Sequence, residues 1–445
     1  MKIAQLTPGS GDNFYCENCL RDGAIVRAMR AAGHDIFLVP MYLPIENAAI
    51  DPDTQGPLFF GGVNVYLQQK SRFFRHTPRW VDRWLDSPRL LRRFGTKAGA
   101  TSPRLLGDMT VSMLKGPTGR QAKEIDRLIG WLSKPDQRPD VVCLSNILLA
   151  GLAKPLRQKL DRPVVCLVQD EDGFVDTLPE PYRSRSWNLL AQRARDIDGF
   201  VAVSEYYGAK MQERLQLDPA RIEVIYTGIE LAGYEPAAEP PPVPTIGFLS
   251  QACEAKGLDV LADAFVILRK DHRLKNVRLR IAGGHSAADE VFLTRVKREL
   301  ACWDLEGYVE FVDRFDKETR IEFLQSLTVL SVPEKNPVAY GLYVLEALAC
   351  GVPAVEPWHG VFEELLEFTG GGVLYRPNNA ANLAEALKPL LLEPDKAREL
   401  GRWGRDAILG RFGIERTVRD LGRFYNDVVL EYNVARKTGG GNDVA

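Results

Sequence analysis

The chain has 445 residues, of which 45% are hydrophobic and 26% charged, a composition typical of water-soluble globular proteins. Lys and Arg number 57 against 59 Asp and Glu, and the resulting net charge of −2 argues neither for nucleic acid nor for an acidic partner, so we expect no nucleic-acid partner. A chain of this length favours two domains, each with its own core.

The N-terminus and the cysteines predict a cytoplasmic protein. MKIAQLTPGSG enters a strand pattern at once and lacks the charged and apolar regions of a signal peptide. The longest apolar stretch, from Val141, is interrupted by Ser145, Asn146 and Lys154 and is too short to span a membrane. Seven cysteines, an odd number, fit a reducing compartment better than a set of disulfides.

Cys16 and Cys19 form a lone C-x-x-C. No second Cys or His pair follows at the spacing of a zinc site, so we expect no bound metal. A metal or redox role remains an alternative to the reading of two small residues at the start of the first helix.

The first half alternates between apolar runs and amphipathic segments. KIAQLTP, a Gly/Asn loop and LRDGAIVRAMRAAGHDIFLVPMY predict a strand, a helix that stops at Gly33, and a second strand. The alternation recurs in DVVCLS, PVVCLVQ and GFVAVS, the last followed by the helical EYYGAKMQERLQL. We predict a parallel, Rossmann-like sheet covered by helices over residues 1–236.

An insertion of irregular structure is expected at about residues 45–132. Its segment 70–94 holds eight Lys and Arg, two acids and five Phe and Trp. Basic and aromatic residues in alternation suit an anionic membrane surface or a phosphorylated acceptor, with Arg72 and Arg75 as candidates. The alternative is that the aromatic rings pack under a solvated arginine face.

A linker and a second domain follow. Residues 235–244 contain five prolines, which disfavour both helix and sheet. The strand and helix patterns then restart, so we predict a second α/β domain over residues 244–412. A C-terminal helix at 413–437 is expected to pack back toward the first domain.

The second domain contains the clearest candidate for an anion site. In YGLYVLEALACG, Gly341 allows a ligand to approach the backbone next to Tyr340, and a helix beginning near Leu342 directs free N–H groups and its positive dipole end outward. Glu346, about one turn later, could accept hydrogen bonds from a ribose diol. The alternative for Glu346 is an ordinary surface glutamate.

Lys256 is a second candidate in this domain. It lies on the loop between a predicted strand and the helix KGLDVLADAF, where its ammonium group could reach a diphosphate. A solvated lysine is the alternative. Neither a G-x-G-x-x-G after a strand nor a P-loop occurs in the chain.

Taken together, these motifs resemble the nucleotide-sugar glycosyltransferases of retaining family 4, which have the GT-B fold. The resemblance runs from LTPG and GHDIFLVP through VAVSEYY and KGLDVLADAF to YGLYVLEALACGVPAVEPWHGVFEELL and GVLYRPNN. In the last part, the residues at the family's spacing are Gly341, Glu346, Gly351, Pro353, Gly360, Glu363 and Pro377.

The resemblance implies two Rossmann-like domains that face each other across a cleft. It implies a nucleoside-diphosphate sugar as the donor substrate, no metal and no other cofactor, with Glu346 on the ribose, Lys256 on the diphosphate and Gly341 beside it. The first domain would hold the acceptor. The residues assigned to the acceptor side are Gly11, Asn13, Arg72 and Arg75.

Four positions depart from the family pattern. Val338 replaces the first glutamate of the paired-glutamate motif, and Gln251 replaces the arginine five residues before the lysine. Gln169 stands where a histidine often ends a first-domain strand, and Thr227 where an asparagine precedes the linker glycine. Glu334 is the acid nearest to Val338 in sequence.

An acidic loop follows Gln169. Its residues Asp170, Glu171 and Asp172 could bind sugar hydroxyls or an acceptor, or could form a solvated loop. We take Gln169, Asp170 and Glu171 as the candidate catalytic residues.

Three hypotheses follow. The first is an active transferase, retaining by family resemblance, whose acceptor is a lipid-linked saccharide, a polysaccharide or a small molecule, with peripheral membrane contact through 70–94. The second is a catalytically degenerate binding or scaffold protein. The third is a nucleotide-sugar epimerase of similar architecture.

Overall fold

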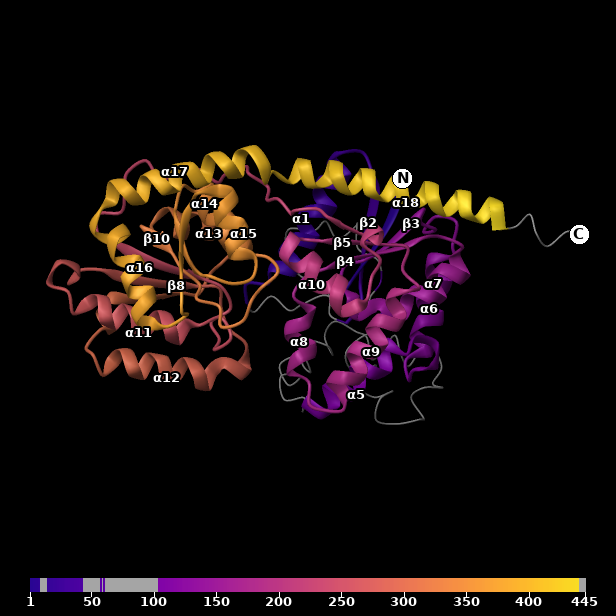
Figure 1. The fold of residues 1–445 in the computed structure, drawn as a ribbon, viewed down its shortest axis with the longest axis horizontal. Coiled ribbons are helices and arrows are strands. Elements are labelled where there is room, and N and C mark those ends of the chain that lie inside the picture. Colours follow the sequence, from indigo (N-terminus) through magenta and orange to yellow (C-terminus); the bar gives the residue numbers. More distant parts are fainter. Residues whose placement is uncertain (9–13, 43–56, 58, 61–102, 440–445) are drawn as a thin grey trace, which may run out of the picture. The chain divides into compact units, whose positions relative to one another are not determined.

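The computed structural model describes residues 1–8, 14–42, 57, 59–60 and 103–439. The chain forms two compact units (Figure 1). The first comprises Met1–Gly11, Cys19–Tyr226 and Thr417–Ala445, and the second comprises Asp12–Asn18 and Thr227–Arg416. These units stand beside the domains predicted from the sequence, 1–236 and 244–412.

The first unit is built on a six-stranded parallel sheet in the order β2-β1-β3-β4-β5-β6. Its four central strands are almost entirely buried, which explains why they read as uninterrupted apolar runs. The strands are β1 (Lys2–Thr7), β2 (Asp35–Pro40), β3 (Val141–Leu144), β4 (Val164–Val168), β5 (Gly199–Ala202) and β6 (Ile222–Val224).

Helices connect these strands. They are α1 (Glu17–Ala31), α5 (Pro103–Leu114), α6 (Ala122–Leu132), α7 (Ala153–Leu160), α8 (Glu171–Thr177), α9 (Tyr182–Ala194) and α10 (Glu205–Leu215). The expectation of an irregular insertion is wrong for residues 103–132, where α5 and α6 bury apolar residues such as Val111 and Leu128. The segment 70–94 lies outside the described residues.

The second unit repeats the architecture with six parallel strands in the order β12-β11-β10-β7-β8-β9. The strands are β7 (Thr245–Leu249), β8 (Arg278–Ala282), β9 (Val309–Val312), β10 (Val329–Leu330), β11 (Ala354–Pro357) and β12 (Gly372–Tyr375). The strand order reverses direction between β7 and β10, as it does between β1 and β3 in the first unit. The predicted pair of doubly wound, Rossmann-like α/β domains is confirmed.

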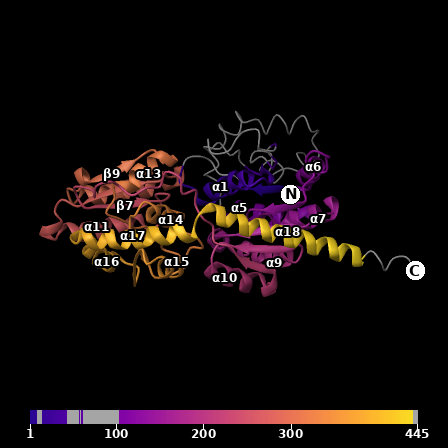
Figure 2. The same ribbon diagram turned by 90° about the horizontal axis from the view of Figure 1, so that it is seen from above.

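Helices cover both faces of the second sheet. They are α11 (Leu258–Arg269), α12 (Glu290–Ala301), α13 (Lys317–Gln325), α14 (Leu342–Ala349), α15 (Val361–Thr369), α16 (Ala380–Leu392) and α17 (Pro394–Arg411). Because crossovers are right-handed, α11 and α12 lie on one face, and α14 and α15 on the other. α16 packs against α11, whereas α17 packs against α14 and α15 (Figures 1 and 2).

The last helix, α18 (Ile414–Gly439), is assigned to the first unit from Thr417 onward. There the Tyr425 hydroxyl donates to the Cys143 Sγ of β3 at 3.4 Å. Arg436 lies 2.5 Å from the Asp161 carboxylate. Among the helices in the described part of the chain, none combines the length and the apolar character needed to cross a bilayer.

Candidate functional site

In the second unit, the reversal of strand order brings together the loops that follow β7 and β10. Gly257, on the first of these loops, has a φ of +72°, and a Cβ there would lie 1.9 Å from the Pro333 carbonyl oxygen. Only glycine fits so close an approach. The contact positions Lys256 next to Glu334, with 2.6 Å between Nζ and Oε1.

Glu334 is a buried carboxylate with two side-chain partners. Besides Lys256, the Tyr343 hydroxyl of α14 donates to Oε1 at 3.2 Å. Burial raises the pKa of Glu334 above its ordinary value, although Lys256 opposes that rise. The alternative of a simply solvated Lys256 is wrong, because its ammonium group is held by this carboxylate while 24% of its side chain stays exposed.

Glu346 is only 2% exposed, so the alternative of a surface glutamate is wrong. The Tyr15 hydroxyl donates to its Oε2 at 2.9 Å, and Arg320 Nη2 donates to its Oε1 at 2.8 Å. The Tyr234 hydroxyl also donates to Oε1. The carboxylate that the resemblance assigned to a ribose therefore has three protein partners in the structure.

Arg320 lies on α13 and is the main cation beside Glu346. Burial lowers the pKa of its guanidinium, but Glu346, Tyr234 and Tyr15 together outweigh this effect, so that the pKa stands above its ordinary value. Its Nη1 also donates to the Phe315 carbonyl oxygen at 2.9 Å. The sequence analysis missed Arg320 and Tyr234, since neither belongs to a recognisable motif.

The start of α14 is also occupied by a side chain of the second unit. Leu342 N–H donates to Glu17 Oε2 at 2.8 Å, which places a carboxylate where an anion was expected. Next to Gly341, the Tyr340 hydroxyl donates to the Thr227 carbonyl oxygen at 3.1 Å. Glu17 was also missed, because nothing in its sequence surroundings points to residue 342.

Two of the four positions that depart from the family pattern, 251 and 338, have partners within the second unit. Gln251 Nε2 donates to Asp289 at 2.8 Å. Val338 is 8% exposed, and its backbone lies against Gly360, where a Cβ would meet the Val338 nitrogen at 2.7 Å. The Val338 carbonyl oxygen also accepts a hydrogen bond from Val361 N–H at 3.0 Å.

A pocket lies at the carboxyl ends of β8 and β9, and Ala252, which follows Gln251 in the sequence, is part of its lining. Its apolar lining includes Ile281, Leu293 and Phe311, and its polar lining includes Lys297 and Asp313. Apolar walls with a few polar groups are typical of small-molecule sites. In open α/β sheets such sites lie outside the carboxyl ends of the strands, which is where this pocket lies.

In the first unit, Gln169 is buried at the carboxyl end of β4. Its Oε1 accepts a hydrogen bond from Arg21, which also pairs with Asp22 at 2.8 Å and donates to the Ser145 carbonyl oxygen at 3.1 Å. The Thr7 hydroxyl donates to Asp22 at 2.7 Å. These residues connect the ends of β1, β3 and β4, and the sequence analysis missed Arg21 and Asp22.

Asp170 and Glu171 begin α8, and the expected acidic loop is therefore partly helical. Asp170 has a φ of +52°, and Glu171 is 2% exposed. Glu171 accepts hydrogen bonds from Ile147 N–H at 3.2 Å and from the Tyr207 hydroxyl at 2.9 Å. Burial raises its pKa to about 8.

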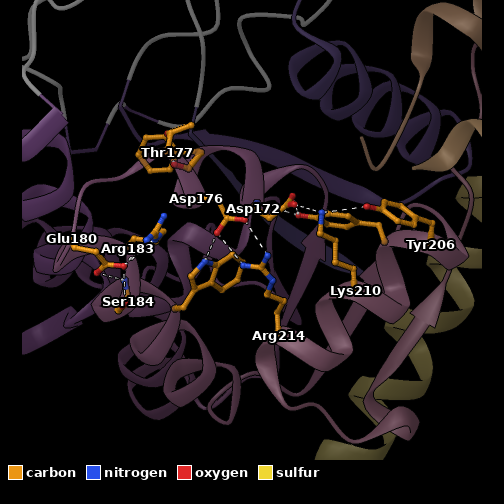
Figure 3. A network of polar contacts seen from close by, with 12 residues as sticks. Asp172, Asp176, Thr177, Glu180, Arg183, Ser184, Tyr206, Lys210 and Arg214 are labelled. Atoms are coloured by element: carbon orange, nitrogen blue, oxygen red, sulfur yellow. Dashed lines mark hydrogen bonds and ion pairs between the residues drawn. The ribbon is translucent and has the colours of Figure 1, made fainter. Parts of the chain in front are cut away.

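The alternative of a solvated acidic loop is wrong for Glu171 and for Asp172, which are both buried. The Asp172 carboxylate accepts from the Tyr207 hydroxyl at 3.0 Å and pairs with Lys210. One turn later, Asp176 pairs with Arg214 at 3.0 Å (Figure 3). These ion pairs attach α8 to α10, so Asp172 has a structural role here.

The acceptor-side candidates Gly11, Asn13, Arg72 and Arg75 lie outside the described residues. Cys16 and Cys19 do not form a disulfide with each other. Within residues 1–8, 14–42, 57, 59–60 and 103–439, no group of three or more His, Cys, Asp or Glu side chains is arranged to hold a metal ion.

Two family models match the chain. Glycosyl transferases group 1 matches residues 235–407, and Glycosyltransferase Family 4 matches residues 110–232. The D-inositol 3-phosphate glycosyltransferase of Salinispora arenicola is 26% identical over 416 residues, which cover 84% of this chain and 88% of that protein.

Solved structures share the fold at low identity. Sucrose-phosphate synthase from Thermosynechococcus elongatus matches with a TM-score of 0.73 and 17% identity over 97% of this chain and all of that one. Anabaena HepE in complex with UDP matches with a TM-score of 0.68 and 14% identity over 96% of this chain and all of that one.

Proposed function

Because this chain is a glycosyltransferase of the GT-B type, similar to family 4, we propose that it transfers a sugar from a nucleoside diphosphate to an acceptor, with retention of configuration. Two connections within the second unit carry the proposal. Lys256 pairs with Glu334, which accepts a hydrogen bond from Tyr343 of α14. Arg320 donates both to Glu346 of α14 and to the carbonyl oxygen of Phe315, which lines the pocket at β8 and β9.

This grouping supports donor binding because it matches the parts of a nucleoside diphosphate. The pocket offers apolar walls for a base, and a carboxylate such as Glu346 accepts hydrogen bonds from ribose hydroxyls. Lys256 and the N–H groups at the start of α14 suit a diphosphate. Gln251, Tyr340, Gly341, Leu342, Val338 and Glu334 complete the proposed donor side.

For the acceptor side we keep the candidates from the sequence. Gln169, Asp170 and Glu171 are the proposed catalytic residues. The acceptor is a lipid-linked saccharide, a polysaccharide or a small molecule. The name of the Salinispora relative, a D-inositol 3-phosphate glycosyltransferase, adds inositol phosphate to the small molecules worth testing.

One observation favours the second candidate, a catalytically degenerate binding protein. Lys256, Glu346 and the Leu342 N–H are all engaged by carboxylates or donors of the same unit. We favour the transferase because these contacts are hydrogen bonds and ion pairs, which a ligand can replace without a change of fold.

The test measures binding first and turnover second. Saturating UDP, GDP or ADP is expected to raise the free energy of unfolding by roughly 2–3 kcal/mol. A panel of sugar nucleotides is then screened for release of nucleoside diphosphate with and without acceptor. Binding without release under any condition favours the degenerate protein, and no binding at all contradicts the donor site. An epimerase would interconvert two sugar nucleotides without an acceptor.

A further inference from the structure

The segment Phe14–Glu17 lies along the proposed donor site and belongs to the same compact unit. Phe14 forms an antiparallel bridge with Gly284, which lines the pocket. Tyr15 N–H donates to the Gly283 carbonyl oxygen at 2.6 Å. The segment therefore starts at the edge of the pocket proposed for the base.

Its side chains then reach the two other parts of the site. The Tyr15 hydroxyl donates to Glu346 Oε2 at 2.9 Å, as a ribose hydroxyl would. The Glu17 carboxylate accepts from the Leu342 N–H at 2.8 Å, as a diphosphate oxygen would. The order of contacts along the segment is the order of base, ribose and diphosphate in a nucleotide.

The burial of Tyr15 indicates that the segment makes a specific contact with the site. Tyr15 is 4% exposed, and Arg320 lies with its guanidinium carbon 5.7 Å from the centre of the Tyr15 ring. A nucleotide bound here would make the same interactions with Glu346 and the Leu342 N–H. The Leu342 N–H has a single hydrogen, so a nucleotide and Glu17 compete for it.

We propose that Phe14–Glu17 is a built-in occupant of the donor site, which a nucleoside diphosphate must displace, and that Glu17 thereby sets the affinity for the donor. This inference rests on the proposed function. The measured affinity for nucleotide is then the intrinsic affinity reduced by the fraction of molecules in which the segment has left the site.

The first experiment compares the wild type with Glu17→Gln in titrations with UDP, GDP and ADP. The neutral amide is a weaker partner for the start of the helix and does not repel a diphosphate, so the dissociation constant should fall about tenfold. Glu385→Gln, a change at an exposed glutamate of α16, is the matched control and should bind as the wild type does. Equal or weaker binding by Glu17→Gln overturns the proposal.

The second experiment uses the wild type alone. Cys16 lies within the segment as a half-buried thiol outside any disulfide, and the exposed Cys302 of the same unit is an internal reference. Alkylation followed by peptide mass spectrometry should be faster at Cys16 when UDP, GDP or ADP is bound, and unchanged at Cys302. If a nucleotide binds but the alkylation of Cys16 is not faster, the proposed displacement of the segment is overturned, while the proposed donor site is not. If neither the wild type nor Glu17→Gln binds any of the three nucleotides, the proposed donor site itself fails and the inference with it.

Discussion

Lys256 and Glu334 form an ion pair in which Nζ lies 2.6 Å from Oε1, with the carboxylate side chain 3% exposed and the lysine 24% exposed. A buried carboxylate is costly without a cation, whereas the partly exposed ammonium can still meet a ligand. Lys256 is thus placed to stabilise the loop after β10, and diphosphate binding by its exposed part is the proposal to be tested.

Lys256→Met separates these two roles. The variant should lose about 3 kcal/mol of unfolding free energy, because Glu334 stays buried without its partner. It should also bind nucleoside diphosphates about 10- to 100-fold more weakly. Adding Glu334→Gln should restore stability in urea unfolding but leave the affinity low in calorimetry. Recovery of affinity in the double variant would mean that Lys256 acts on the fold alone.

Glu346→Ala is expected to be severely destabilising. Arg320 would remain buried without a counterion, at a cost of about 3–5 kcal/mol in unfolding free energy. The same change should remove most of the stabilisation by nucleotides, which the resemblance predicts. The control Glu385→Ala should stay within about 0.5 kcal/mol of the wild type. If Glu346→Ala unfolds at the same urea concentration as the wild type, the buried ion pair between Arg320 and Glu346 does not stabilise the fold.

The strands and the main helices were predictable because buried parallel strands are continuous apolar runs and helices begin and end with local signals. Gly341, Leu342 and Glu346 were found through one such local pattern. The helices at 103–132 were missed although α6 has an apolar face that includes Ile125, Leu128 and Leu132, because the whole of 45–132 was read as one irregular insertion.

The partners at the site could not be predicted in the same way. Tyr15 meets Glu346 across 331 positions of sequence, and Glu17 meets Leu342 across 325. Arg21 reaches Gln169 across 148 positions. These contacts depend on the folded arrangement of elements, and a single sequence contains no local signal for them.

Glu171 should make the stability of the protein fall as pH rises. Burial raises its pKa to about 8 from an unfolded value of 4.5, so the folded state binds the proton more tightly than the unfolded chain. Between pH 4.5 and pH 8, the contribution of Glu171 to the free energy of unfolding should therefore decrease by up to about 1.4 kcal/mol per pH unit. Below pH 4.5 and above pH 8 its contribution is constant.

The measurement is urea unfolding from pH 4.5 to 8 for the wild type and Glu171→Gln. The variant should have a flatter pH dependence whatever its absolute stability, because its amide does not titrate. Asp176→Asn, which changes an exposed acid of the same helix, is the control and should keep the wild-type slope in this range. Equal slopes for the wild type and Glu171→Gln would contradict the raised pKa.

The basic and aromatic segment 70–94 should bind anionic vesicles weakly, with each nearby Lys or Arg contributing about 1 kcal/mol at most. Flotation with phosphatidylserine vesicles at low and high salt measures this, with neutral vesicles as the control. Arg72→Gln with Arg75→Gln should reduce the bound fraction. Equal recovery with neutral vesicles, or binding that high salt does not weaken, would favour aromatic residues packed within the protein.

The replaced positions 251 and 338 give the sharpest test of whether the site is active. An arginine at position 251 would meet Asp289, the present partner of Gln251, so Gln251→Arg alone should gain little affinity for a diphosphate. With Asp289→Asn the guanidinium is released, and nucleotide binding should tighten about 10- to 100-fold relative to Asp289→Asn alone.

Val338 cannot accept a hydrogen bond from a sugar hydroxyl, so we expect an unusual donor preference in an active enzyme, with Glu334 or Glu171 compensating. The parent should then release nucleoside diphosphate from some donor, and Glu334→Ala or Glu171→Ala should abolish that release while the fold persists by circular dichroism. Val338→Glu with Gln251→Arg should shift the preference toward common donors. If that double variant turned over a common donor while the parent used none of the donors screened, the chain would be the catalytically degenerate protein.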